Sequence, residues 1–86
     1  MASYSLEIKR SAAKELAQLP PKDRGRIVMR IQALADEPRP VGAEKLSSQE
    51  RYRIRQGDYR ILYEIEDQVL RIIVVKMGHR RNVYRA

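Results

Sequence analysis

Arginine alternates with apolar residues along one stretch of the chain, and these arginines are the residues best suited to chemistry. Arg51, Arg53 and Arg55 share this alternation, and Arg60 follows just beyond a Gly-Asp turn. Successive side chains on a strand point to opposite faces of a sheet. If the two stretches pair as a hairpin, Arg53, Arg55 and Arg60 stand on one face, roughly 5–8 Å apart. One guanidinium group can donate two parallel hydrogen bonds to the oxygens of a phosphate. The spacing therefore predicts that the three guanidinium groups repel one another when no ligand is bound, and that a bound polyanion is favoured on this face.

The C-terminal segment offers further candidates. His79, Arg80, Arg81 and Tyr84 follow Gly78 and could fold over the sheet edge towards the arginines. A tyrosine ring can stack on a nucleobase, which contributes about 1–3 kcal/mol, and its hydroxyl can take part in proton transfer. Two alternatives stay open here: Tyr84 could instead pin the tail by packing, and His79 could contact phosphate or act as a base.

Composition narrows the classes of function. The chain has 18 Lys and Arg against 11 Asp and Glu, a net charge of +7 and a pI near 10.1, which favours a polyanionic partner. Residues 51–86 carry nine basic and four acidic residues. With no cysteine and one histidine, disulfides, thiol catalysis, iron–sulfur clusters and multi-histidine metal sites are excluded, so no metal or cofactor is expected. No apolar run approaches the roughly 20 residues of a membrane span, and no signal-peptide core is present, so a cytoplasmic location is expected.

Hydrophobic periodicity predicts a small α+β domain covering residues 1–86. Two helices should pack on one face of a mainly antiparallel four-stranded sheet, in the order β-α-α-β-β-β. The arginines should then lie on the other face. Gly57 should take a positive φ in the hairpin turn. The expected elements are a strand over Tyr4–Ile8, helices over Ala12–Leu19 and Pro21–Ala35, and strands over Arg51–Arg55, Tyr59–Glu66 and Val69–Lys76. Gly78 is expected to break the last strand.

Fixed positive charge without a catalytic triad, a metal cluster or a carboxylate pair suits phosphoryl transfer on RNA. There the ribose 2′-hydroxyl is a built-in nucleophile, and the protein mainly stabilises developing charge. Arginine, with a pKa above about 12, is a poor base, so an external scaffold such as the ribosome could supply geometry. The alternative is a solvated face with Glu64 and Glu66 as partners of the arginines. We expect the nearest acids to lie further along the strand, which favours a binding face.

Two segments resemble the RelE/ParE toxin superfamily. They are the hairpin Tyr52–Tyr63, with its Gly-Asp-Tyr-Arg run, and the terminal segment Lys76–Tyr84. The resemblance implies the toxin of a toxin–antitoxin pair. In the RelE branch the toxin enters the ribosomal A site and cuts mRNA through the 2′-hydroxyl, without a metal. In the ParE branch the toxin inhibits DNA gyrase. A non-enzymatic basic module that binds RNA or protein is the third alternative.

The resemblance also implies roles for individual residues and partners. Catalytic roles fall on five residues and RNA-binding roles on three more: Arg53, Arg55, Arg60, Arg80 and Tyr84 in the first group, and Arg51, His79 and Arg81 in the second. Well-known members carry lysine at the first two positions, and arginine here removes a possible lysine base. The implied partners are a small antitoxin that wraps the toxin, the ribosome with its mRNA, and promoter DNA only through the antitoxin. No membrane partner is expected.

Overall fold

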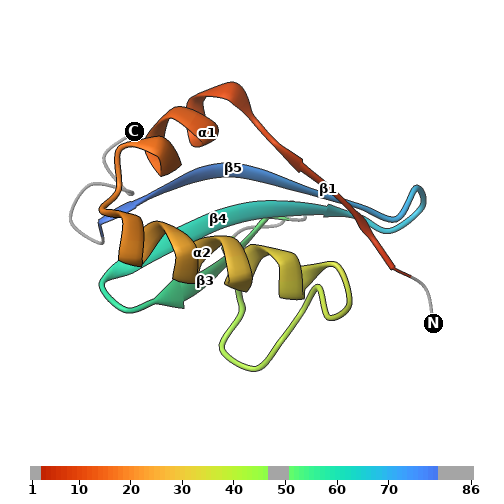
Figure 1. The fold of residues 1–86 in the computed structure, drawn as a ribbon. Helices are drawn as coiled ribbons and strands as arrows, with labels where there is room; N and C mark the ends of the chain where they lie inside the picture. The colour runs from red at the N-terminus through yellow and green to blue at the C-terminus, as the bar shows by residue number, and fades with distance from the viewer. Residues whose placement is uncertain (1–2, 47–50, 80–86) are drawn as a thin grey trace.

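The structure, a computed structural model, describes residues 3–46 and 51–79 and contains two helices beside one mixed sheet (Figure 1). The sheet order is β1-β5-β4-β3-β2; β1 pairs with β5 in parallel, and the other pairs are antiparallel. The elements are β1 (Ser5–Ile8), α1 (Arg10–Ala17), α2 (Pro21–Leu34), β2 (Glu44–Lys45), β3 (Arg51–Gln56), β4 (Tyr59–Glu66) and β5 (Arg71–His79).

The α+β class and the order of the main elements are confirmed, but the expected count of four strands is wrong. The fifth strand is β2, whose two residues Glu44 and Lys45 pair with Arg53 and Tyr52 of β3. Two residues are too few to show an alternating pattern, so sequence periodicity could not reveal this strand. Because β2 lies at the sheet edge beside β3, its Glu44 becomes the ion-pair partner of Arg53, one of the predicted site residues.

Both helices cover the same face of the sheet. Ala12 of α1 and Ile27, Ile31 and Leu34 of α2 are buried in one cluster with the apolar side chains of the strands. In Figure 1, α1 lies over β5 and α2 runs beside β3 and β4. The strand residues of this cluster are Tyr52, Ile54, Ile61, Tyr63, Ile65, Ile72, Val74 and Met77. We call the other side of the sheet the open face, since neither helix packs on it.

Neither helix begins with a side-chain hydrogen bond from its N-cap residue. The second helix starts at Pro21, because proline loses nothing at a first-turn position whose N–H has no helical partner. The first helix runs two residues earlier than the expected Ala12–Leu19. Its N-cap is Lys9 in an extended conformation, without a side-chain hydrogen bond to the first turn.

The β3–β4 hairpin closes as predicted, whereas β5 is longer than expected. Gly57 has φ +61°, at the first central position of the turn, which suits a residue without Cβ. The prediction that Gly78 ends the last strand is wrong. Gly78 pairs with Arg60, and β5 continues to His79 opposite Tyr59. Pairing with β4 outweighs the weak strand preference of glycine.

A polar network ties the β4–β5 turn to the loop that follows α2. Arg39 donates to both carboxylate oxygens of Asp67 at 2.9 and 3.3 Å and, through Nε, to the Tyr52 hydroxyl at 3.0 Å. The Tyr4 hydroxyl donates to Asp67 at 2.7 Å. The hydrogen bonds from Arg39 and Tyr4 hold the pKa of the Asp67 carboxyl below its usual value. The charged carboxylate is therefore the form that the fold stabilises.

Replacing Asp67 by asparagine should lower Tm at pH 7 and make Tm less dependent on acid. Because the folded pKa of Asp67 lies below the unfolded value of about 3.9, its contribution is complete above that value. The contribution is lost as pH falls through the folded pKa. Thermal unfolding between pH 7 and 2 should show the gap between wild type and Asp67→Asn narrowing below about pH 4. The exposed Asp36→Asn is the matched control, and a gap that stays constant with pH would contradict this account.

Candidate phosphate-binding face

Strand register places the predicted arginines in a row across the open face. Arg55 of β3 lies directly opposite Arg60 of β4, and Arg60 lies directly opposite Gly78 of β5. We call Arg55 and Arg60 the arginine pair. Two like charges at paired positions destabilise a sheet. The glycine beside them has no side chain, which allows close approach of a ligand to the backbone. The row therefore places two arginines and a glycine side by side across three strands.

The neighbouring row brings a cation that the sequence did not single out. Arg53 lies opposite Leu62, which in turn lies opposite Lys76 of β5. A β-bulge between Leu62 and Tyr63 makes this possible. The bulge leaves Val75 out of the register, so that Lys76 and not Val75 faces the same way as Leu62. In a regular strand Lys76 would point to the helix side, as Val74 does.

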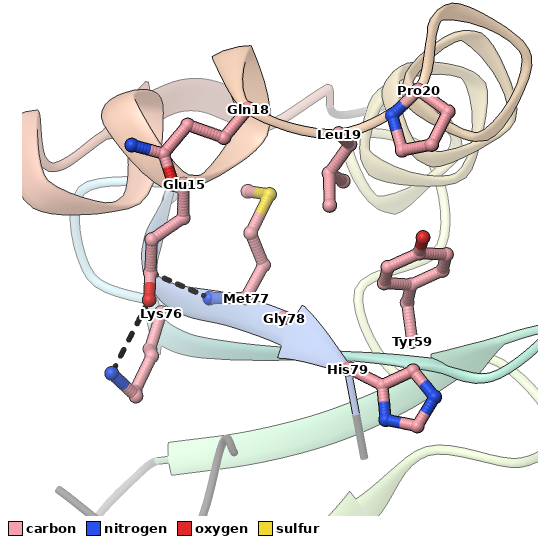
Figure 2. Close-up of a pocket in the computed structure, with 9 residues that line it drawn as sticks. All are labelled: Glu15, Gln18, Leu19, Pro20, Tyr59, Lys76, Met77, Gly78 and His79. Atoms are coloured by element: carbon pink, nitrogen blue, oxygen red, sulfur yellow. Dashed lines mark hydrogen bonds and ion pairs between the residues drawn. The ribbon is translucent and has the colours of Figure 1, made fainter. Parts of the chain in front are cut away.

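Lys76 is positioned by α1. Its Nζ donates to Glu15 Oε2 at 3.3 Å, and Glu15 Oε1 accepts the backbone N–H of Met77 at 3.1 Å. β1 pairs with β5 only as far as Val74. Glu15 therefore satisfies one backbone group of β5 beyond the end of β1, and it holds the lysine at the same time. Figure 2 shows the Glu15 side chain reaching past β5 to both groups.

Two of the predicted site arginines are paired with acids of the chain itself. Arg51 donates to Glu64 directly opposite, at 2.6 Å, and Arg53 forms an ion pair with Glu44 of β2. The expectation that the nearest acids lie further along the strand is therefore wrong. The Arg51–Glu64 pair is half-buried, and the Arg53 side chain is only 12% exposed in its pair with Glu44. Arg55 and Arg60 differ from Arg51 and Arg53, because each has another arginine directly opposite it on the neighbouring strand.

His79 is the last residue of β5, so the prediction that it belongs to a C-terminal tail is wrong. It pairs with Tyr59, and its ring meets the Tyr59 ring edge-on, with centroids 6.1 Å apart and planes at 80°. The Tyr59 hydroxyl donates to Asp23 at 3.0 Å, and this bond raises the pKa of Tyr59. Because the bulge reverses the facing of β5, His79 follows the helix side while Gly78 follows the open face. The remaining predicted residues Arg80, Arg81 and Tyr84 lie outside the described residues.

A cavity of about 370 Å³ opens where α1 passes into α2 at the end of β5 (Figure 2). It is lined by Glu15, Gln18, Leu19, Pro20, Tyr59, Lys76, Met77, Gly78 and His79. A second cavity of about 280 Å³ shares Tyr59 and His79 with it. Sequence spacing could not reveal either cavity, because each is lined by residues from segments that are distant from one another in the chain.

The fold and the site define a class: small basic α+β domains in which two helices cover one sheet face and cations gather on the other. The family model for the ParE toxin of type II toxin–antitoxin systems, parDE, matches residues 6–84. The chain therefore belongs to this family of the RelE/ParE toxin superfamily and is a toxin of the type II class.

Individual relatives agree with this assignment. The chain is 29% identical over 84 residues to the toxin RelG of Mycobacterium tuberculosis, covering 95% of this chain and 97% of RelG. The toxin–antitoxin complex RelBE2 from the same organism gives a TM-score of 0.82 at 26% identity, with 95% and 97% of the two chains covered. The archaeal RelE–RelB complex from Pyrococcus horikoshii gives 0.80 at 27% identity, with 98% and 99% covered. The predicted superfamily and the predicted fold class are thus confirmed.

In the described part of the chain, none of the helices is long and apolar enough to span a membrane.

Proposed function

We propose that this toxin is a ribosome-dependent mRNA endonuclease that uses the ribose 2′-hydroxyl as its nucleophile and no metal. The observation that carries the proposal is the arginine pair, Arg55 directly opposite Arg60, with Gly78 as the next residue of the row. A sheet that keeps two cations at paired positions gives up stability. Such local conflicts are typical of functional sites, and a bound phosphate would remove the repulsion.

The reaction requires charge stabilisation above all. Attack of the 2′-oxygen forms the 2′-O–P bond, and the P–O5′ bond breaks, leaving a 2′,3′-cyclic phosphate and a 5′-hydroxyl. The phosphodiester carries one negative charge and the phosphorane two, so guanidinium groups bind the transition state more strongly than the substrate. Arg53, Arg55, Arg60 and Arg80 take this role in the proposal, while Arg51, His79 and Arg81 hold the RNA.

Proton transfer falls to the C-terminal residues in this proposal. The 2′-hydroxyl must lose a proton and the 5′-oxygen must gain one. Tyr84 is the proposed group for one of these transfers, and the ribosome supplies substrate geometry that the toxin lacks. The solved relatives RelBE2 and archaeal RelE–RelB are toxin–antitoxin complexes, which supports a RelB-type antitoxin as the partner. Promoter DNA would be reached only through that antitoxin.

Inhibition of DNA gyrase is the second candidate function, because the matching family model carries the ParE name. This function would require binding to gyrase and no cleavage of RNA. Structural relatives with sequence identity above 25% include RelE proteins in complex with RelB, which favours the first candidate. The two functions differ in their target and can be separated with purified components.

Cleavage of mRNA should appear only when ribosomes are present. Primer extension on mRNA in a reconstituted translation reaction should show cuts within the A-site codon, because the ribosome must orient the 2′-hydroxyl for in-line attack. The same toxin should leave free mRNA intact and should not change gyrase supercoiling. Intact mRNA together with gyrase-linked DNA breaks would instead establish the second function.

A further inference from the structure

We infer that the cavity at the end of β5 is a nucleobase subsite that receives a base next to the scissile phosphate. The inference deepens the proposed function and rests on it. It starts from a cavity whose walls are assembled by α1, the α1–α2 connection, β4 and β5, and whose rim belongs in part to the open face. We define the base subsite as this cavity of about 370 Å³.

Gly78 of β5 links the base subsite to the arginine pair, because it lines the cavity and lies directly opposite Arg60. Lys76 and Gly78 line the cavity, and register places both on the open face, where Gly78 lies directly opposite Arg60. A nucleotide whose phosphate rests over Gly78 would therefore already contact one residue of the cavity lining. Lys76 and Glu15, which form an ion pair at 3.3 Å, also line the cavity.

The walls of the subsite suit a flat heterocycle. Leu19 and Pro20 supply apolar surface, and the Tyr59 ring lies below them in Figure 2, while Met77, which also lines the cavity, is itself fully buried. The ring of Tyr59 is held in place by its hydrogen bond to Asp23, and His79 stands perpendicular to it. Single-stranded RNA bases are bound in this way, by stacking on aromatic rings and by hydrogen bonds along one edge. The volume falls within the range of ligand pockets.

Polar groups at the subsite favour bases that carry an exocyclic amino group. The Glu15 carboxylate already accepts one bond on each oxygen, yet a carboxylate oxygen has a second lone pair with which to accept an amino N–H. The exposed Gln18 side chain adds an amide, which can donate and accept together, as in the pairing of amides with adenine. Adenine, guanine and cytosine have such an amino group, whereas uracil lacks it.

Nucleotide binding to the purified toxin tests the inference without the ribosome. In NMR titrations, AMP, GMP and CMP should shift the resonances of Leu19, Tyr59 and Met77, and UMP should bind at least about fivefold more weakly. Inorganic phosphate should affect only the open face. Gln18→Ala should weaken AMP binding about tenfold, the loss expected for one bidentate base contact. It should leave phosphate binding unchanged, and the exposed Gln32→Ala on α2 is the matched control.

The outcomes separate this inference from the proposed function. If nucleotides cause no shifts beyond those of inorganic phosphate, or all four bind equally and Gln18→Ala has no effect, the subsite is wrong while ribosomal cleavage can still stand. If nucleotides bind as expected but mRNA is never cut on the ribosome, the subsite stands and the nuclease function falls. Where both hold, Gln18→Ala should change the preferred codon more than the total cleavage rate.

Discussion

Arg60→Ala should lower the rate of mRNA cleavage on the ribosome by at least about a hundredfold, the loss typical when one preorganised donor to a developing oxyanion is removed. Arg60 is the central member of the row on the open face, with Arg55 on one side and Gly78 on the other. Its charge should act mainly on the phosphorane, so kcat should fall more than KM rises. Single-turnover cleavage of mRNA in stalled ribosome complexes measures this loss.

Matched variants separate loss of function from loss of fold. Arg60→Lys keeps the charge without the planar fork and should recover only part of the rate. Arg71→Ala removes an arginine from the same face at the distant β4–β5 turn, where it pairs with Glu66 at 2.5 Å, and should cleave normally. Arg55→Gln should lose activity while Tm holds or rises, because it removes one of two like charges at paired positions. Cleavage by folded Arg60→Ala within threefold of wild type would reject the arginine pair as the site.

Ile61→Ala should cost about 2–5 kcal/mol in the free energy of unfolding, the usual range for truncating a fully buried isoleucine. Ile61 lies opposite Ile54 on the helix side of the hairpin, and neither residue is exposed. A domain of this size has only about 4–13 kcal/mol to lose. The same two strands carry the arginine pair on the other face, so the packing of this pair of isoleucines supports the geometry of the site.

Urea unfolding followed by circular dichroism measures the effect. Val41→Ala is the matched control, since the side chain of Val41 is 98% exposed and its truncation should change stability by less than about 0.5 kcal/mol. A loss below about 1 kcal/mol for Ile61→Ala would mean that the hairpin is not anchored to the helices as described.

Local pattern was a reliable guide to which side chains share a face. Alternation along β3 and β4 correctly placed Arg53, Arg55 and Arg60 together, and the Gly-Asp turn correctly predicted the positive φ of Gly57. These features follow from the two-residue period of a strand and from the conformational freedom of glycine. Both are properties of a few adjacent residues, so a single sequence contains them.

The partners of the arginines were decided by contacts distant in sequence. The ion pair of Arg53 depends on β2, and that of Arg51 depends on the register that places Glu64 directly across from it. The sequence shows that acids are present and not which arginine each will meet, because cross-strand register is fixed by the packing of the whole sheet.

The amino-acid sequence by itself determined the class of the fold, the basic charge and the common face of the three hairpin arginines, since each depends on composition or on short-range periodicity. Only the tertiary structure decided what surrounds them. One extra residue in β5, the bulge at Val75, turns Lys76 towards the open face and His79 towards the helices. The bulge thereby puts Met77, and not Lys76, on the core side opposite Ile61, where Met77 is fully buried. This burial is possible only once β4, β5 and the helices pack together.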